Sequence, residues 1–311
     1  MTKTLSLQEK LDSGQFVVTG ELAPPKSASR EIVLKKAHWL RGFDGVNITD
    51  NQLAVCRMAP LAVAAILIEE GIVPIQQFTL RDRNKLGLQS DLLGAYALGV
   101  RDIFCLTGDH PRFGNHPDAK PVFEFTIMEF MQKVGALSEK GQFFNGELIK
   151  SPPGVVPKFF IGAAANPITK GGMDGNIERL HKKWEAGARF FQTQPVFDIE
   201  GFEQWMEAVR RSGLHKKAHI LAGAMPVKSV KGINHLAKDV PGNFVPEHII
   251  QRMEKATDPA AEGKAICVEI LKAIKKVEGV HGAHLMSVAW EETLPEVARA
   301  AGLLGSEMKT R

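Results

Sequence analysis

Eight short apolar segments, each followed by a stretch with helical spacing, constrain the fold of this chain more than any other feature of its sequence. The apolar segments cover residues 16–22, 45–49, 73–80, 102–108, 158–165, 189–194, 219–225 and 283–290. Their nearly continuous hydrophobicity is typical of strands that are covered on both faces. Alternation of such strands with helices predicts a parallel sheet.

The number and spacing of these units predict how the sheet closes. Most strands follow the previous one after about 30 residues, the length of one strand–helix–strand repeat. Eight repeats predict a (β/α)8 TIM barrel, and a single domain over residues 1–311 suits its size. A doubly wound open sheet is the alternative, which the lack of a GxGxxG fingerprint disfavours. Two longer intervals predict an insertion after the fourth strand (141–157) and two extra helices before the eighth (245–256 and 260–279).

Composition and charge argue against several classes of protein. The chain is 44% hydrophobic and 24% charged, and its net charge of +4 comes without a basic stripe interleaved with aromatics, so we expect no nucleic-acid partner. Cys56, Cys105 and Cys267 are far apart and the histidines are scattered, so we expect buried cysteines and no metal site. No apolar leader and no run of about 18 apolar residues occur, which predicts a cytoplasmic protein without a membrane span.

Polar residues follow nearly every predicted strand. In barrels of this kind the chemistry takes place at the carboxyl ends of the strands, so these residues predict one active site. They include Glu21, Thr49, Asp50, Gln77, Thr79, Asp82, Thr107, Asp109, Asn166, Gln192, Gln194 and Glu291. For Thr49, Asp50 or Asp82 taken singly, a helix cap or a solvated loop residue is an equal alternative.

Two carboxylates stand out by their sequence context. Glu21 lies within an apolar strand, where desolvation raises the pKa of a carboxyl and suits it to act as a general acid. Asp109 follows Gly108, which lets the backbone approach a ligand closely.

Gln192 and Gln194 are two apart on one strand, and their amides suit a planar heterocycle. Because no nucleophile motif is present, we expect a cofactor to supply the chemistry.

A set of motifs in a fixed order resembles a known family. The motifs are Gly-Glu-Leu-Ala-Pro-Pro (20–25), Asn-Ile-Thr-Asp-Asn (47–51), Thr-Gly-Asp (107–109), Ala-Asn-Pro (165–167), Lys-x-x-Ala-Gly-Ala (183–188), Gln-Pro-Val-Phe-Asp (194–198) and Gly-Ala-Met-Pro (223–226). Together they resemble methylenetetrahydrofolate reductase from about Val17 to Glu292, as its catalytic barrel alone. The resemblance implies a flavin, FAD or FMN, whose reduced N5 passes a hydride to 5,10-methylenetetrahydrofolate and yields 5-methyltetrahydrofolate.

The resemblance also implies roles for individual residues. Glu21 matches the acid that opens the imidazolidine ring, Asp109 the catalytic aspartate beside flavin and pterin, and Gln194 the glutamine that binds the pterin. The positions that match the flavin site are Thr49, Gln77, Thr79, Thr107, Gly108, Asp109, Asn166 and Lys183. For Lys183, a solvated lysine on a helix face is the alternative.

Departures from the family pattern concern the source of electrons. Thr107, Asn166 and Gln77 stand where many members have arginine, tyrosine and histidine, and the usual Leu-Asn-Arg is absent around Trp290. NADH or NADPH is the family's usual donor, but this variant resembles members of anaerobic one-carbon pathways, which receive electrons from a cysteine-rich partner subunit. We also expect an oligomer. The alternative function is a pterin-binding barrel that acts as a methyltransferase or a non-catalytic partner subunit, against which Glu21 and Asp109 together argue.

Overall fold

The strands of the chain close into a barrel in the order of the sequence. The computed structural model describes residues 5–150, 155–167, 172–240 and 242–305. All neighbouring strands are parallel, and the barrel closes because β1 pairs with β8 as well as with β2. The strands are β1 (Val17–Leu22), β2 (Gly45–Ile48), β3 (Pro74–Thr79), β4 (Asp102–Leu106), β5 (Phe160–Ala165), β6 (Phe190–Pro195), β7 (His219–Ala224) and β8 (Gly282–Leu285). The predicted (β/α)8 barrel is therefore confirmed.

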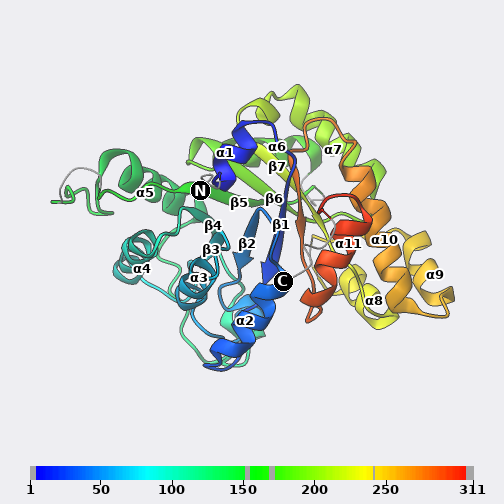
Figure 1. Cartoon of the computed structure of the whole chain (residues 1–311). Coiled ribbons are helices and arrows are strands. Elements are labelled where there is room, and N and C mark those ends of the chain that lie inside the picture. The colour runs from blue at the N-terminus through cyan, green and yellow to red at the C-terminus, as the bar shows by residue number, and fades with distance from the viewer. Residues whose placement is uncertain (1–4, 151–154, 168–171, 241, 306–311) are drawn as a thin grey trace.

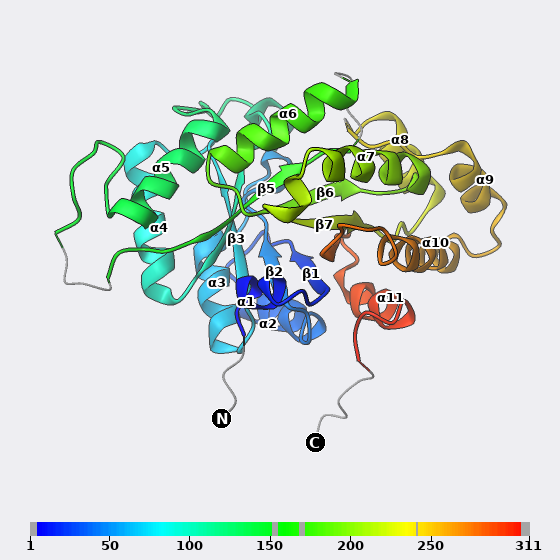
Figure 2. The same ribbon diagram turned by 90° about the horizontal axis from the view of Figure 1, so that it is seen from above.

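Helices surround the strands (Figure 1, Figure 2). They are α1 (Leu7–Asp12), α2 (Arg30–Trp39), α3 (Pro60–Glu69), α4 (Lys85–Leu98), α5 (Ile127–Lys140), α6 (Gly172–Glu185), α7 (Ile199–Arg211), α8 (Val230–Lys238), α9 (Glu247–Lys255), α10 (Pro259–Ile274) and α11 (Leu294–Ala300). Several begin at a residue whose side chain accepts a hydrogen bond from a backbone N–H of the first turn, as Ser29, Asn84 and Asp198 do. Short 3-10 turns η1 (Gln52–Ala54), η2 (Pro111–Phe113), η3 (Leu214–Lys216) and η4 (Glu291–Thr293) complete the chain that is described.

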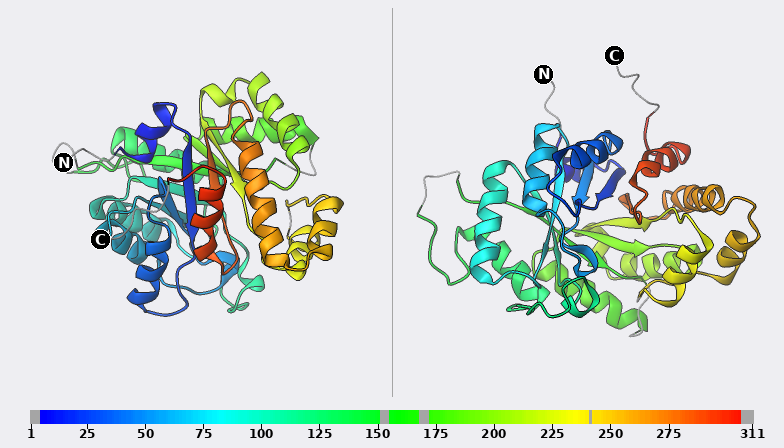
Figure 3. Two further views of the ribbon diagram at one scale, coloured as in Figure 1. Left: turned by 45° about the vertical axis from the view of Figure 1, so that its right-hand side comes forward. Right: turned by 90° about the horizontal axis from the view of Figure 1, so that it is seen from below.

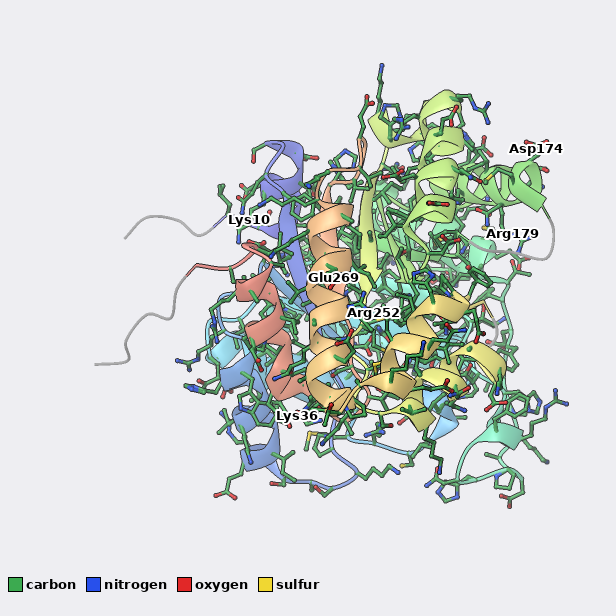
Figure 4. All side chains as sticks on the ribbon, turned by 90° about the vertical axis from the view of Figure 1, so that its right-hand side faces the viewer. Lys10, Lys36, Asp174, Arg179, Arg252 and Glu269 are labelled. Atoms are coloured by element: carbon green, nitrogen blue, oxygen red, sulfur yellow. The ribbon has the colours of Figure 1, made fainter. Side chains whose placement is uncertain are left out.

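Both predicted additions to the barrel are present. After α5, an isolated antiparallel bridge between Gln142 and Leu148 gives the insertion a hairpin-like start, while its residues 151–154 lie outside the described part. Before β8 the structure has α9 and α10, as predicted, and also α8, which packs beside α9 (Figure 3). Arg252 of α9 and Glu269 of α10 face one another in Figure 4, joined by two hydrogen bonds of 2.7 and 3.0 Å.

The clearest differences from the prediction lie at the end of the eighth strand and at the amino terminus. The eighth strand was expected to continue to Trp290 but ends at Leu285, and the backbone four residues later, at Ala289, has a φ of 51° that lies outside the strand region. Helix α1 was not predicted, although Ser6 and Glu9 form a capping box whose spacing is visible in the sequence.

The amino-terminal end of the barrel is filled by apolar side chains. Leu7 and Leu11 of α1 pack against an inner layer made of Val17, Ile75, Phe104, Phe160, Phe190 and Leu221. The rings of Phe160 and Phe190 stack with their centroids 5.0 Å apart. A Cβ at Gly162 would lie 2.2 Å from the Phe190 ring, so glycine is needed there. This layer fills the interior of the barrel at its amino-terminal end, among the described residues.

Asp102, the first residue of β4, is a buried carboxyl near this apolar layer. Only 2% of the residue is exposed, and its Oδ1 has no hydrogen-bond partner among the described residues. Burial raises the pKa of the Asp102 carboxyl to about 7. The folded protein therefore keeps a proton that the unfolded chain releases near pH 4.

The raised pKa of Asp102 predicts how the stability of the protein depends on pH. Between about pH 4 and 7 the native state binds up to one more proton at Asp102 than the unfolded state does. The free energy of unfolding therefore falls as the pH rises through this range, by up to about 1.4 kcal/mol per pH unit. The side chain at position 102 cannot titrate in the Asp102→Asn variant, so this loss of stability is absent. Between pH 4.5 and pH 7.5 the free energy of unfolding, measured by urea denaturation, should therefore fall less in the variant than in the wild type. Asp118→Asn, in an exposed loop, is the control and should follow the wild type. Equal decreases in wild type and Asp102→Asn would contradict the assignment.

Candidate functional site

A cavity of about 400 Å³ opens at the carboxyl ends of β2 to β5. Most of the residues predicted to bind the cofactor line it, namely Gln77, Thr79, Thr107, Gly108, Asp109 and Lys183. Thr49 and Asn166 do not belong to this lining. The structure therefore brings most of the predicted set together around one space.

The two buried threonines of this set support the wall of the cavity. The Thr49 hydroxyl donates to Gln52, and Gln52 lines the cavity. The backbone N–H and the hydroxyl of Thr79 both donate to Asp50 Oδ2, each at 2.8 Å. Asp50 also forms an ion pair with Arg83. These contacts fix the ends of β2 and β3 against each other.

Arg81 is a further residue of this wall, and the sequence reading gave it no role. It is 2% exposed, and its guanidinium forms two 2.7 Å hydrogen bonds with the Asp82 carboxylate. It also donates to the carbonyl oxygens of Asp109 and Asn51, each at 3.1 Å. One buried cation thus ties together the loops that follow β2, β3 and β4.

The loop after β2 carries unusual backbone angles. Asn51, Leu53 and Ala54 have φ values of 47°, 57° and 54°, a region that residues other than glycine rarely adopt. The Leu53 N–H donates to Asp109 Oδ2 at 3.2 Å, so the loop is held to the carboxylate predicted to lie beside the cofactor. Gly108 has a φ of 87°, and a Cβ there would approach Thr79 Cβ to 3.0 Å. Glycine at this position lets Asp109 stand close to β3.

Glu21 is the last residue but one of β1, and 19% of its side chain is exposed. Its Oε2 is 3.9 Å from His284 Nε2, and a hydrogen bond joins it to Gln77. Burial, with a smaller contribution from the nearby Glu291, raises the pKa of Glu21 to about 7, although the Gln77 hydrogen bond opposes this. Burial lowers the pKa of His284 to about 3, so this imidazole is neutral. Glu21 is therefore the group of this pair that exchanges a proton near neutral pH.

A buried hydrogen-bond network lies beneath Glu21. His284 Nδ1 is 2.9 Å from Thr19 Oγ1, and Gln192 Nε2 donates to the same oxygen at 3.3 Å. Asn47 and Gln192 exchange two amide hydrogen bonds of 2.6 and 3.1 Å. Neither Asn47 nor His284 was given an individual role from the sequence, although both are polar residues inside apolar strands. The sequence pattern paired Gln192 with Gln194, but Gln192 is buried in this network below the mouth.

A smaller cavity of about 110 Å³ lies beside the first one, between β5, β6 and α6. Its lining includes Asn166, Lys183 and Gln194, so the residues predicted for the flavin and for the pterin meet here. Arg179 lines it too and lies on α6, where Figure 4 labels it. Lys183 lines both cavities.

Lys183 is half-buried and does not extend into solvent from its helix. Its Nζ donates to the Ala164 carbonyl at 2.5 Å. Burial, with a contribution from Arg179, lowers the pKa of Lys183 to about 8. Lys183 therefore places a cation, anchored to β5, at the boundary between the two cavities.

Within the described residues no three His, Cys, Asp or Glu side chains are grouped so that they could hold a metal ion. Cys105 and Cys267 are buried as expected, but Cys56 is exposed. None of the helices in the described ranges is long and apolar enough to cross a membrane.

Comparison with known proteins gives consistent matches. A family model described as methylenetetrahydrofolate reductase matches residues 6–302. Methylenetetrahydrofolate reductase 2 of Schizosaccharomyces pombe is 26% identical over 333 residues, which cover 99% of this chain and 48% of that protein. The probable methylenetetrahydrofolate reductase (NADPH) of Caenorhabditis elegans is 25% identical over 272 residues, 85% of this chain and 37% of that protein. The chain thus spans less than half the length of these two relatives.

A solved structure shares the fold. It is an uncharacterized protein from Clostridium thermocellum, described as binding two copies of 5-methyl-5,6,7,8-tetrahydrofolic acid. It superposes with a TM-score of 0.64 at 16% sequence identity, covering 96% of this chain and 98% of that chain. At this level of identity the likeness establishes the common barrel architecture.

Proposed function

This chain belongs to the methylenetetrahydrofolate reductase family, and we propose that it uses a bound flavin to reduce 5,10-methylenetetrahydrofolate to 5-methyltetrahydrofolate. The observation that carries the proposal is Glu21, a carboxyl with a pKa of about 7 at the mouth of the barrel. The names of the relatives support the same reaction, and the ligand of the Clostridium protein is of the proposed folate class.

The cavity at the carboxyl ends of β2 to β5 is suited to the flavin. Its volume of about 400 Å³ lies within the range of small-molecule sites, and its lining offers an amide at Gln77 and a cation at Lys183. These are groups that hydrogen-bond the oxygens and nitrogens of a flat heterocycle. Gln77, Thr107 and Lys183 would hold the flavin, with Thr49 and Thr79 supporting the wall behind it. When bound, FAD or FMN supplies the hydride.

Glu21 provides the proton that the substrate needs. The imidazolidine ring opens to a reactive iminium only after a ring nitrogen is protonated, and a general acid works best when its pKa is near the working pH. Glu21 is about half protonated near pH 7. The neutral His284 does not compete for this role, and its contact with Thr19 fixes the imidazole beside the acid.

The other predicted residues surround the pterin and the flavin. Gln194 and Asn166 line the smaller cavity, where amide groups match the donors and acceptors of a pterin edge. Asp109 is exposed at the mouth and held by the Leu53 N–H. Its negative charge opposes further negative charge nearby, which makes the flavin harder to reduce. Electrons come either from NADH or NADPH or from a cysteine-rich partner subunit.

One experiment tests the function. The purified protein should be yellow, and 5-methyltetrahydrofolate added anaerobically should bleach its flavin, because the proposed reaction is reversible at the flavin. Reduction by NADH, by NADPH and by a low-potential viologen is then compared to identify the class of donor.

Lys183→Met should weaken flavin binding by about tenfold, since it removes a charged donor worth about 1.5 kcal/mol.

The control is the neighbouring Lys182→Met, an exposed lysine paired with Glu178, which should bind flavin as the wild type does. A yellow protein that no reduced folate bleaches would overturn the proposal. A colourless protein that binds folate would favour the methyltransferase or non-catalytic subunit instead.

A further inference from the structure

A third cavity lies at the amino-terminal end of the barrel, away from the two cavities at the carboxyl ends of the strands. Its volume is about 770 Å³, within the range of small-molecule sites. Its walls come from α1, from the end of α3 with its loop to β3, and from the loop between α4 and β4. None of the residues predicted to bind the flavin or the folate belongs to this lining. The cavity is therefore separate from the proposed active site.

The side chain of Asp102 points toward the inside of the barrel at this end. Phe104, two residues further along β4, belongs to the inner apolar layer, and alternate residues of a strand face the same side. Asp102 lines the cavity, is 2% exposed, and has no hydrogen-bond partner at its Oδ1 among the described residues. An unpaired buried acceptor costs folding free energy, and a ligand that brings a donor to it recovers that cost.

The carboxyl groups around the cavity favour a positively charged ligand. Glu9 and Asp12 of α1 line it together with Asp102. Glu9 accepts a hydrogen bond from the Ser6 N–H at 2.7 Å, and Asp12 lies 3.0 Å from His219 Nε2. Asp102 is therefore the carboxyl of this group with an oxygen left for a ligand, while the other two add negative charge at the rim.

Arg101 is the cationic side chain of the lining, and its contacts hold it away from Asp102. Its Nη1 donates to the carbonyls of Tyr96 and Val100, each at 2.9 Å. The guanidinium also lies over the Tyr96 ring, 3.8 Å from its centre. The negative charge of the cavity is therefore not neutralised by a direct ion pair with Arg101.

The remaining wall is largely apolar. Ile72 and Pro74 are buried in it, and Ile68 and Val73 are partly buried. Such surface favours contact with the hydrocarbon part of a ligand. In the part of the chain that the structure describes, no three His, Cys, Asp or Glu side chains are placed to hold a metal ion. An organic cation suits this combination of apolar wall and buried carboxyl better than a metal ion does.

We propose that this cavity binds a small organic cation, an amine with a hydrocarbon body, whose ammonium group donates a hydrogen bond to the Asp102 carboxylate. The hydrocarbon part packs on Ile72 and Pro74, and the carboxylates of α1 attract the cation from solvent. The inference does not depend on the proposed reaction, because Asp102 begins β4 at the amino-terminal end of the barrel, whereas Glu21 lies near the carboxyl end of β1.

Benzylamine and benzyl alcohol test the proposal, because they share a hydrocarbon body and only the amine is charged. Both are titrated at pH 8, above the Asp102 pKa of about 7, so that this carboxyl is mostly ionised. Saturation-transfer NMR measures the two affinities. For a probe this small we expect benzylamine to bind with a Kd of about 1 mM, and benzyl alcohol to bind at least about tenfold more weakly.

Two variants locate the site. Asp102→Asn keeps the size of the side chain but removes its charge, so it should weaken benzylamine binding by at least about tenfold. Gln8 is an exposed residue of α1 that lines the same cavity, and Gln8→Trp should weaken binding by filling the space while Asp102 stays in place. Asp118→Asn, which removes a carboxylate from an exposed loop, is the control and should bind benzylamine as the wild type does.

Three results would overturn the inference. Equal affinities for the amine and the alcohol would show that the cavity does not select a cation. Benzylamine binding that survives both Asp102→Asn and Gln8→Trp would place the ligand elsewhere. A wild-type protein that binds no benzylamine far above the expected Kd would have no such site. None of these measurements involves the flavin or the folate, so failure of the proposed function would leave them unaffected.

Discussion

Replacing Glu21 by glutamine should slow reoxidation of the reduced flavin by 5,10-methylenetetrahydrofolate by about 10²- to 10⁴-fold, the usual contribution of a general acid. Glutamine keeps the size of the side chain and its contact with Gln77 but carries no proton to transfer. Reduction of the flavin by its electron donor needs no such proton and should stay close to the wild-type rate. Stopped-flow absorbance measures the two half-reactions separately.

Glu292→Gln is the matched control. Glu292 is an exposed carboxylate in the turn that also holds Glu291, and its loss should leave both half-reactions unchanged. If Glu21→Gln lost both half-reactions equally, Glu21 would be needed for the flavin site as a whole, and its role as the acid would be wrong.

Arg81→Leu should cost about 2–3 kcal/mol of the free energy of unfolding, chiefly because two backbone carbonyls lose a charged donor. The substitution leaves the Asp82 carboxylate and the carbonyls of Asn51 and Asp109 without the donor that joins them. These loops line the cavity at the carboxyl ends of β2 to β5, so the variant should also bind flavin more weakly than the wild type. Urea denaturation and flavin titration measure the two effects.

The control for this prediction is Arg112→Leu. Arg112 is exposed near the same mouth and lies over the ring of Phe113, so its removal should change stability by no more than about 0.5 kcal/mol. An Arg81→Leu protein with wild-type stability but weak flavin binding would show that Arg81 acts on the ligand and that the loops do not depend on it.

The barrel was predictable because its strands are buried on both faces. Continuous apolar runs of strand length, separated by amphipathic helices, leave few alternatives to a parallel sheet, and eight of them fit a closed one. The end of β8 was not predictable in the same way. Residues 286–290 are as apolar as a strand, but the backbone turns away at Ala289, and composition carries no signal for that turn.

The candidate site was partly predictable for a similar reason. A carboxyl in an apolar strand drew attention to Glu21, and the same criterion applied to His284 would have found its neighbour. Strand periodicity indicated which side Gln192 faces but not its depth, which depends on how the strands tilt in the barrel. The contact of Lys36 with Glu291 joins residues 255 apart in the chain, and no local pattern predicts it.

The pairing of β1 with β8 has a consequence for the order in which the protein assembles. A chain made from its amino terminus exposes the edge of β1 until the last strand has left the ribosome, and contacts across such a long loop form late. The contact of Thr19 with His284 spans 265 residues and that of Lys36 with Glu291 spans 255. The residues that line the cavity at the carboxyl ends of β2 to β5 come from β2 to α6 and need no contribution from β8. A nascent chain would therefore build the cavity for the flavin first, and the surroundings of Glu21 would be completed last.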